Sequence, residues 1–354
     1  MAGENDLLNN SQLSHYRINM LFAGLIFILV FSFILDIFLG SVSISPREIL
    51  RAMSGSSGDV TEKILLEFRL PKAITALLAG IALSVSGLQM QTLFRNPMAG
   101  PYVLGLSSGA SLGVAFVILG FASGISTEGI RGLGNWAIAA ASWLGAGFIM
   151  LIIMMISSRV KNILTVLILG IMLSSGISAI VSIMQYFSSE TLLKSYVIWT
   201  MGSLGNLSSD QLIIMVISVG AGILLSLISV KTLNALLLGE EYAKSLGLDV
   251  RRSRRILIAG TSILAGTVTA FCGPIGFIGI AVPHLARIIF RTANHKVLLP
   301  ATILTGAIVM LLGDVVSQLP GSDIILPVNS VTALIGIPVV IWVILQNQRS
   351  GEIF

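Results

Sequence analysis

Long apolar runs dominate this sequence, and the first of them, Ile18–Leu39, is long enough to cross a bilayer, which takes about 20 residues in a helix. Only 10% of the residues are charged and 55% are hydrophobic, whereas soluble domains are about one quarter charged. Inside lipid the backbone must satisfy its own hydrogen bonds, so only helices or a closed barrel can span. The runs are unbroken rather than alternating, which excludes barrel strands. We therefore predict an all-α, polytopic membrane protein.

About ten spans are expected from the apolar runs, and the chain is predicted to form a single membrane domain over residues 18–346. The pair of runs flanking Gly273-Pro274 can also be read as one broken segment. The predicted spans are Ile18–Leu39, Ala73–Leu93, Val103–Phe121, Trp136–Ser157, Leu164–Tyr186, Leu212–Val230, Ile256–Phe271, Ile275–Phe290, Pro300–Leu319 and Val331–Leu345.

Basic residues set the expected orientation. With the N-terminus inside, the inner connections carry 14 of the 21 basic residues, which the positive-inside rule favours. Residues 1–17 and 347–354 are then cytoplasmic tails, and no cleavable signal peptide is expected. Two connections are long. Residues 40–70 lie outside, with a short helix expected from Ser45-Pro46, and residues 231–255 lie inside.

The sequence offers no catalytic or metal site of its own. It has no phosphate loop of the G-x-x-x-x-G-K-[ST] type, so any ATP must be bound by another chain. A single cysteine, Cys272, and three scattered histidines, His15, His284 and His295, do not predict a metal site. The two G-x-S-x-G matches within Gly105–Gly113 lie in an apolar run without a nearby histidine, so we interpret them as helix-packing residues rather than nucleophiles.

Two acidic residues, Asp36 and Asp314, fall near the ends of apolar runs. An acid within a membrane span is a candidate ion-coupling site, but each can equally lie at the interface. His284 follows Val282-Pro283 and is interpreted as a structural group beside a helix kink.

The inner segment Gly239–Gly247 is predicted to be a short helix. Glu240 and Glu241 favour its N-terminal end, Lys244 lies one turn after Glu240, and Gly247 favours a stop. A capped helix in a membrane connection suits docking by a cytoplasmic partner. The arginines that follow, Arg251, Arg252, Arg254 and Arg255, are expected to anchor the chain against anionic lipid.

Arg69 and Lys72 flank Pro71 at the outer end of the second span. Their side chains can snorkel to lipid headgroups or form a positive socket for acidic groups of an outer partner. The spacing leaves both interpretations open.

Several blocks, in order from about Ser41 to Leu345, resemble the FecCD family, the membrane permeases of ABC importers for iron–siderophore complexes, haem and cobalamin. The matching blocks are Arg69–Lys72, Leu93–Pro97, Leu104–Ala110, Trp199–Leu204, Leu238–Gly247, Gly273–Arg287 and Val331–Pro338.

The resemblance implies the type II ABC importer architecture, with ten spans per subunit and a homodimer whose axis carries the substrate. It also implies two cytoplasmic ATPase subunits that hold ATP and magnesium, a periplasmic binding protein, and residence in the inner membrane. Nucleic acid is not an expected partner. The chain would be a permease and not an enzyme, and the chelate itself stays open.

The resemblance also assigns site residues. Arg69 and Lys72 match two binding-protein pocket positions, whereas Gln318 stands where a third arginine is usual, and Asn329 replaces a usual glycine. A cytoplasmic gate is expected at Asn162, Ile163, Leu164 and Thr165. The ATPase-coupling residues are Gly239, Glu240, Glu241, Tyr242, Ala243, Lys244, Ser245, Leu246 and Gly247.

The function predicted from these features is ATP-driven import of a metal chelate by alternating access. The alternative is an ion-coupled secondary transporter that uses Asp36 or Asp314.

Overall fold

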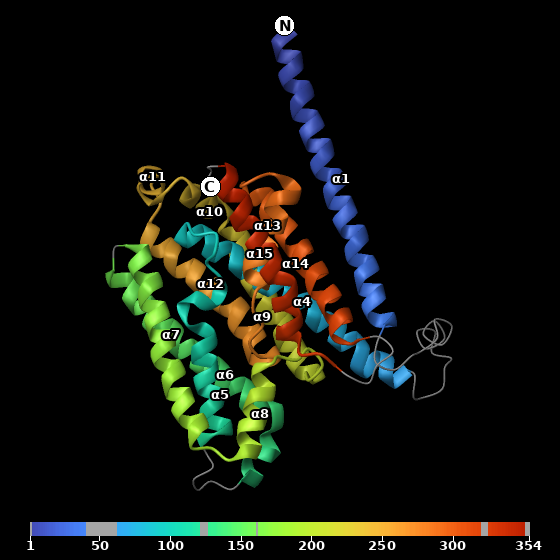
Figure 1. The fold of residues 1–354 in the computed structure, drawn as a ribbon. Coiled ribbons are helices and arrows are strands. Elements are labelled where there is room, and N and C mark those ends of the chain that lie inside the picture. The colour runs from blue at the N-terminus through green and yellow to red at the C-terminus, as the bar shows by residue number, and fades with distance from the viewer. Residues whose placement is uncertain (1, 40–61, 121–126, 161, 320–324, 351–354) are drawn as a thin grey trace.

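The computed structural model describes residues 2–39, 62–120, 127–160, 162–319 and 325–350, and this part of the chain is helical without a β-strand (Figure 1). The helices, in chain order, are α1 (Ala2–Phe38), the π-helical turn η1 (Ile64–Arg69), α4 (Leu70–Phe94), the 3-10 turn η2 (Pro101–Leu104), α5 (Leu106–Ile118), α6 (Thr127–Arg159), α7 (Ile163–Tyr186), α8 (Glu190–Thr200), α9 (Ser209–Ile228), α10 (Val230–Leu237), α11 (Glu240–Ser245), α12 (Val250–Cys272), α13 (Ile278–Phe290), α14 (His295–Ser317) and α15 (Val328–Ser350).

The predicted spans each coincide with a helix. Seven helices of the described chain are long and apolar enough to cross a membrane: α1, η1 continued by α4, α6, α7, α9, α12 and α14. The remaining three predicted spans correspond to the shorter apolar helices α5, α13 and α15. The runs flanking Gly273-Pro274 are two separate helices, α12 and α13, rather than one broken segment. The all-α polytopic fold class is confirmed.

The helix boundaries differ from the expectation at two places. Helix α1 begins at Ala2 rather than near Ile18, so the polar residues before the first span continue the same helix. Helix α8 was not expected as a separate element. It has only 11 residues and is too short to cross a bilayer. The helix expected from Ser45-Pro46 lies outside the described residues.

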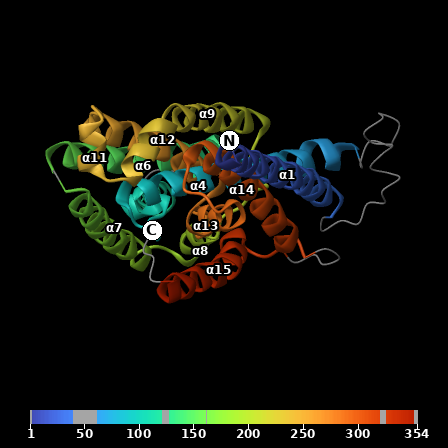
Figure 2. The ribbon, with the colours of Figure 1, turned by 90° about the horizontal axis from the view of Figure 1, so that it is seen from above.

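The core of the molecule is built around α4. Most of α4, α12 and α14 is buried, whereas α1, α6, α7 and α9 bury less than a third of their apolar windows. Figure 2 shows α4 near the centre of the bundle, with α7, α8 and α15 along one side and α9 along the other. The exposed faces of the outer helices are apolar, as lipid contact requires.

Glycines let the helices approach closely. The carbonyl oxygen of Gly279 occupies the space that a Cβ at Gly87 would need, which brings α13 against α4. In the same way the carbonyl oxygen of Gly109 on α5 fills the Cβ position of Gly145 on α6, and Ala141 O fills that of Gly113. Gly109 and Gly113 belong to the two G-x-S-x-G matches. Their assignment to helix packing is therefore confirmed.

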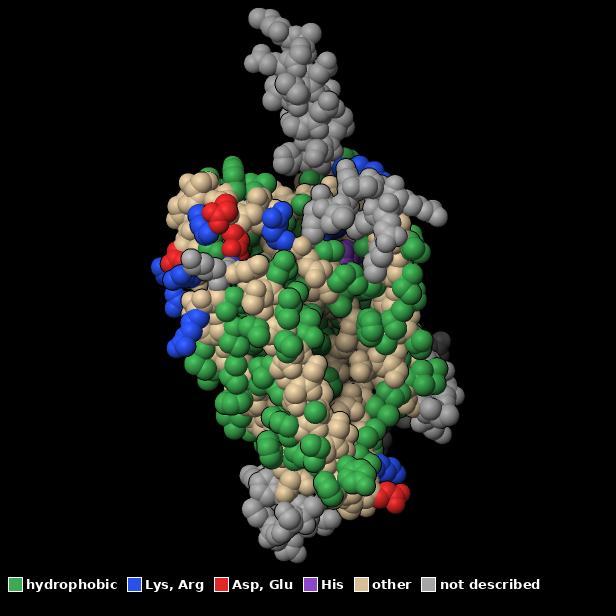
Figure 3. All heavy atoms as spheres, turned by 60° about the vertical axis from the view of Figure 1, so that its left-hand side comes forward, with side chains coloured by type: hydrophobic (Ala, Val, Ile, Leu, Met, Phe, Trp, Pro, Cys, Tyr) green, Lys and Arg blue, Asp and Glu red, His purple; other side chains and the backbone are tan. Residues whose placement is uncertain are grey.

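Charged side chains lie at the ends of the bundle. On the face shown in Figure 3 they gather around the end that carries α11, with a few at the opposite end and an apolar surface between. The four α7 side chains of Ile168, Met172, Ile180 and Ile183 are 47–66% exposed. This distribution suits a protein surrounded by lipid at its middle.

Candidate functional site

The short helix predicted between Gly239 and Gly247 is present as α11. Gly239 precedes it with φ of +109° and Gly247 follows it with φ of +82°, backbone conformations that L side chains rarely adopt. Tyr242 and Leu246 are exposed large apolar side chains, 49% and 58%. The segment thus presents an apolar patch at the end of the bundle where α10 and α11 lie (Figure 1).

Glu240 is half-buried, unlike its exposed neighbours Glu241 and Tyr242. Its carboxylate accepts hydrogen bonds from Arg254 Nη2 at 2.5 and 2.6 Å and from Arg254 Nε at 3.1 Å. Arg254 is 3% exposed and starts the second turn of α12. A bidentate, largely buried pair of this kind fixes direction as well as distance. Glu240 therefore attaches α11 to the body of the bundle.

The same guanidinium reaches a third element. Arg254 Nη1 donates to the carbonyl oxygen of Val160 at 3.3 Å. Val160 follows the last residue of α6, and α7 begins at Ile163. Arg254 consequently joins the α11 helix to the end of α6, close in sequence to the start of α7 and the predicted gate.

Glu241 differs from Glu240 although it is adjacent. Its side chain is 89% exposed and pairs with Lys244, which is 51% exposed, one turn away at 2.5 Å. Exposed pairs of this kind contribute only about 0.3–0.5 kcal/mol. The two glutamates that looked equivalent in the sequence have separate roles, one internal and one at the surface.

The predicted gate residues form the first turn of α7. The Asn162 side chain accepts a hydrogen bond from Leu164 N at 2.9 Å and so caps the helix. Asn162, Leu164 and Thr165 are exposed, and Ile163 is half-buried.

Asp36, Arg69, Lys72, Asp314 and Gln318 form one polar cluster at the end of the bundle away from α11. Lys72 Nζ lies 3.1 Å from Asp314 Oδ1. The Gln318 amide donates to Asp314 Oδ2 at 2.8 Å and to Asp36 Oδ1 at 3.2 Å. The cluster thereby links α1, α4 and α14 through residues that the sequence had suggested for different purposes.

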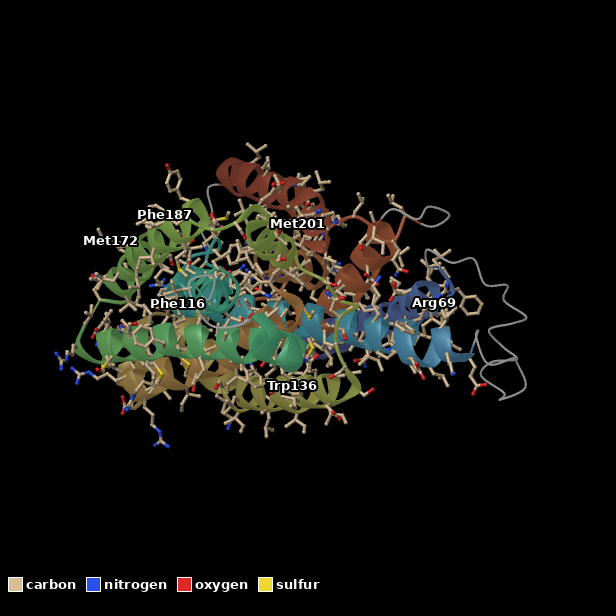
Figure 4. The ribbon with its side chains drawn as sticks, turned by 90° about the horizontal axis from the view of Figure 1, so that it is seen from below. Arg69, Phe116, Trp136, Met172, Phe187 and Met201 are labelled. Atoms are coloured by element: carbon tan, nitrogen blue, oxygen red, sulfur yellow. The ribbon has the colours of Figure 1, made fainter. Side chains whose placement is uncertain are left out.

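Arg69 completes this polar cluster from η1. Its Nη1 donates to the carbonyl oxygens of Ile37 at 2.8 Å and Phe38 at 3.1 Å, which end α1. A cation at a helix C-terminus satisfies carbonyls that have no helical partner and is attracted by the helix dipole. Figure 4 places Arg69 on the side of the molecule away from Met172 of α7.

Neither predicted socket cation extends into solvent. Arg69 is 9% exposed and the Lys72 side chain 21% exposed, and both have partners inside the chain. The acids Asp36 and Asp314, which are 3% and 0% exposed, are buried within this cluster. The four-residue spacing of Asp314 and Gln318 was the available sequence signal for a link between them.

Breaking the Lys72–Asp314 pair is expected to destabilise the protein. Lys72→Met leaves a fully buried carboxylate without its cation, a change that costs roughly 3–5 kcal/mol in buried pairs. We expect lower thermal stability in detergent, followed by size exclusion after heating. Lys63→Met, at an exposed residue nearby, is the control. Equal stability of the two variants would contradict the structural importance of the pair.

Asn329, which stands where the FecCD resemblance implies a glycine, has a structural role. Its side-chain oxygen accepts from the Gly276 backbone N–H at 3.0 Å, and its own N–H donates to Met201 O at 3.1 Å. It thus holds the turn before α13, where Phe277 has φ of +66°. His284, in turn, hydrogen-bonds the carbonyl oxygen of Pro97 at 2.8 Å, as a structural histidine would.

Comparison with known proteins agrees with this architecture. The FecCD transport family matches residues 28–346. The chain belongs to the FecCD transport family. The vitamin B12 import system permease BtuC of Salmonella paratyphi A is 37% identical over 289 residues, which cover 81% of this chain and 85% of the relative. The protein of the same name from Klebsiella pneumoniae is 33% identical over 346 residues, 98% of this chain and 99% of the relative.

Solved structures show the same fold. An inward-facing metal-chelate type ABC transporter superposes with a TM-score of 0.80 and 31% identity, covering 92% of this chain and 99% of that chain. PsaBC from Streptococcus pneumoniae, at 17% identity and a TM-score of 0.51, shares the fold alone. This chain is therefore a transport permease with the type II ABC importer fold.

Proposed function

We propose that this protein is the membrane permease of an ATP-driven importer that moves a metal chelate from periplasm to cytoplasm. Two relatives are named as vitamin B12 permeases and one structural neighbour as a metal-chelate transporter. Within the chain, the observation that best supports this function is α11, a short helix at one end of the bundle that Glu240 and Arg254 hold to the core. Iron–siderophore complexes, haem and cobalamin are the candidate cargoes.

The charge distribution supports an inner-membrane location with both termini in the cytoplasm. Arg251, Arg252 and Arg255 are exposed beside α11. Basic residues favour the cytoplasmic side of a bilayer and its anionic headgroups. The end of the bundle that carries α11 is accordingly the cytoplasmic end, and the polar cluster that contains Arg69 faces the periplasm.

The proposed complex is a homodimer of this chain with two ATPase subunits and a periplasmic binding protein. ATP and magnesium belong to the ATPase subunits, which dock on Gly239–Gly247 through the exposed Tyr242 and Leu246. The binding protein docks over Arg69, Lys72 and Gln318. Because both cations are engaged internally, its acidic groups must compete with Asp314 for Lys72 and with the end of α1 for Arg69.

In the proposed alternating-access cycle, the Glu240–Arg254 pair and the Arg254–Val160 hydrogen bond pass movement of α11 to the start of α7. Closure of the ATPase dimer moves α11, and Glu240 transmits the movement to Arg254. Arg254 is bonded to Val160, so the connector that begins α7 moves with it. The gate at Asn162–Thr165 opens or closes because it follows this connector. Transport needs no bond chemistry in this chain, and the ATPase cycle supplies the energy.

The rival function is ion-coupled transport through Asp36 or Asp314. Both carboxylates are already engaged within the chain, since Lys72 pairs with Asp314 and the Gln318 amide donates to both acids. Membership of the FecCD transport family favours the ATP-driven importer over this alternative.

Uptake into proteoliposomes tests the proposal. The permease, its ATPase subunits and its binding protein are reconstituted, and ferric siderophore, haem and cobalamin are offered in parallel. We expect uptake of one class that requires both ATP and the binding protein. Failure of all three classes under these conditions would contradict import of a metal chelate.

A further inference from the structure

A pocket of about 250 Å³ opens between α5, α7 and α8. Figure 1 shows α8 at the end of the bundle away from α11. Helix α5 contributes Ser107, Ser108 and Ser111, and α8 contributes Tyr196 and Thr200. Ser107 and Ser111 lie one helical turn apart, as do Tyr196 and Thr200, so each helix turns one polar stripe toward the same hollow.

Helix α7 completes the lining with Ser178, Ser182 and Gln185, again on one face. Among the described lining residues, the aliphatic ones are Ile177 and Val181. The opposite face of α7 is apolar and exposed, with Ile180 at 47% and Ile183 at 59%. Ser178 and Ser182 are exposed as well, whereas Ile177 and Val181 are buried, so the α7 hydroxyls lie where the pocket opens to the surface.

The hydroxyls of this pocket can bind more than they now do. Ser182 donates to Ser178 O at 2.9 Å and Thr200 to Val197 O at 2.7 Å, which leaves their lone pairs as acceptors. Within the described chain, no hydrogen bond is formed by the side-chain hydroxyls of Ser107, Ser108 and Ser111, all half-buried. Polar groups in a membrane bundle are usually bonded to one another or line a space for water or a solute.

The chemistry of the lining limits the occupant. None of the described lining residues is charged, so a carboxylate entering the pocket finds no cation among them to offset its lost hydration. Hydroxyl and amide side chains instead donate to and accept from neutral groups such as amides and hydroxamates. Whole-ligand sites usually measure about 300–1,000 Å³, so this pocket suits one arm of a larger chelate.

We infer that the α5–α7–α8 pocket is a transient binding site for a neutral, oxygen-rich arm of the transported chelate. The inference rests on the proposed function and adds a substrate class to it. Chelates with amide or hydroxamate peripheries are accepted, and those that present carboxylates, such as haem or ferric citrate, are disfavoured. Ser111 and Tyr196 form its inner edge, where Tyr196 Oη donates to Ser111 O at 3.4 Å.

Cysteine protection tests the site without depending on transport. Cys272 is the only cysteine of the chain and is buried, so an introduced thiol is the accessible one. The variant Ser182→Cys is compared with Ser175→Cys, at an exposed serine of the same helix outside the pocket. Both are labelled with a small maleimide in the permease–ATPase complex in nanodiscs. The added ligand is a free ferric hydroxamate or ferric citrate.

We expect the ferric hydroxamate to slow labelling of Ser182→Cys several-fold, with no effect on Ser175→Cys and no protection by ferric citrate. Equal labelling with and without the hydroxamate would overturn the inference. So would a Ser182→Cys thiol that stays unlabelled without ligand, since a second copy of the chain would then cover the pocket. Protection by citrate alone would overturn the substrate class.

Transport gives a second, independent result. The double variant Ser107→Ala/Ser111→Ala is expected to import ferric hydroxamate about three- to tenfold more slowly at saturating binding protein, as the loss of one or two neutral hydrogen bonds predicts. Ser175→Ala/Ser195→Ala, which alters exposed serines bonded within their own helices, is the control. Wild-type rates in the pocket variant would overturn the site, whereas a wild-type protein that imports no chelate would overturn the proposed function instead.

Discussion

Arg254→Ala is expected to reduce ATP-driven uptake by at least about tenfold while the ATPase subunits still co-purify with the permease. The substitution removes both the Glu240 pair and the bond to Val160, so α11 keeps its exposed docking surface but loses its attachment. Breaking a buried pair costs roughly 3–5 kcal/mol, and each 1.4 kcal/mol corresponds to a factor of ten. Because the Glu240 side chain is 22% exposed, the lower end of that range applies.

Matched variants separate attachment from docking. Lys296→Ala removes an exposed cation at the start of α14, outside Gly239–Gly247, and is expected to leave uptake within about twofold of wild type. Glu240→Arg combined with Arg254→Glu is expected to restore part of the lost uptake by reversing the pair. ATP hydrolysis that continues without uptake in Arg254→Ala would identify a lost attachment. Normal uptake in that variant would contradict the role given to Arg254.

Gly145→Val is expected to prevent or severely weaken folding of the helix bundle. The added Cβ would overlap the carbonyl oxygen of Gly109, which is backbone and cannot rotate away. Overpacking costs typically about 1–3 kcal/mol even where side chains can adjust, so the loss here should be at least that large. The measurement is the fraction of monodisperse protein after heating in detergent.

Gly147→Val is the control for the destabilisation expected in Gly145→Val. It lies two residues away on α6, and a Cβ there meets no atom within 4 Å. We expect the Gly147 variant to be as stable as wild type. Equal losses in both variants would indicate that α6 tolerates no β-branched residue, rather than that α5 and α6 need close contact at Gly145.

The sequence predicted the membrane helices and the short α11 helix because local patterns determine both. A span is visible as an apolar run, and α11 is visible from its acidic start and its flanking glycines. Helix α8 was missed because it is short, carries Glu190 and Lys194, and lies in the connection expected between the spans Leu164–Tyr186 and Leu212–Val230.

Contacts between distant segments could not be predicted from such patterns. Glu240 and Glu241 are equivalent by sequence, and only packing shows that Glu240 turns to Arg254, 14 residues later. Lys72 and Asp314 are likewise 242 positions apart by their residue numbers. The polar stripe of Ser178 and Ser182 is visible at helical spacing, but its convergence with α5 and α8 requires the folded bundle.

The measurement that tests the central claim most directly compares two driving forces for chelate uptake. Proteoliposomes with permease, ATPase subunits and binding protein receive either internal ATP without an ion gradient, or a proton or sodium gradient without ATP. We expect uptake with ATP, none with either gradient, and little with ATP in Arg254→Ala. Gradient-driven uptake by the permease without its ATPase subunits, abolished by Asp314→Asn, would contradict an ATP-driven importer.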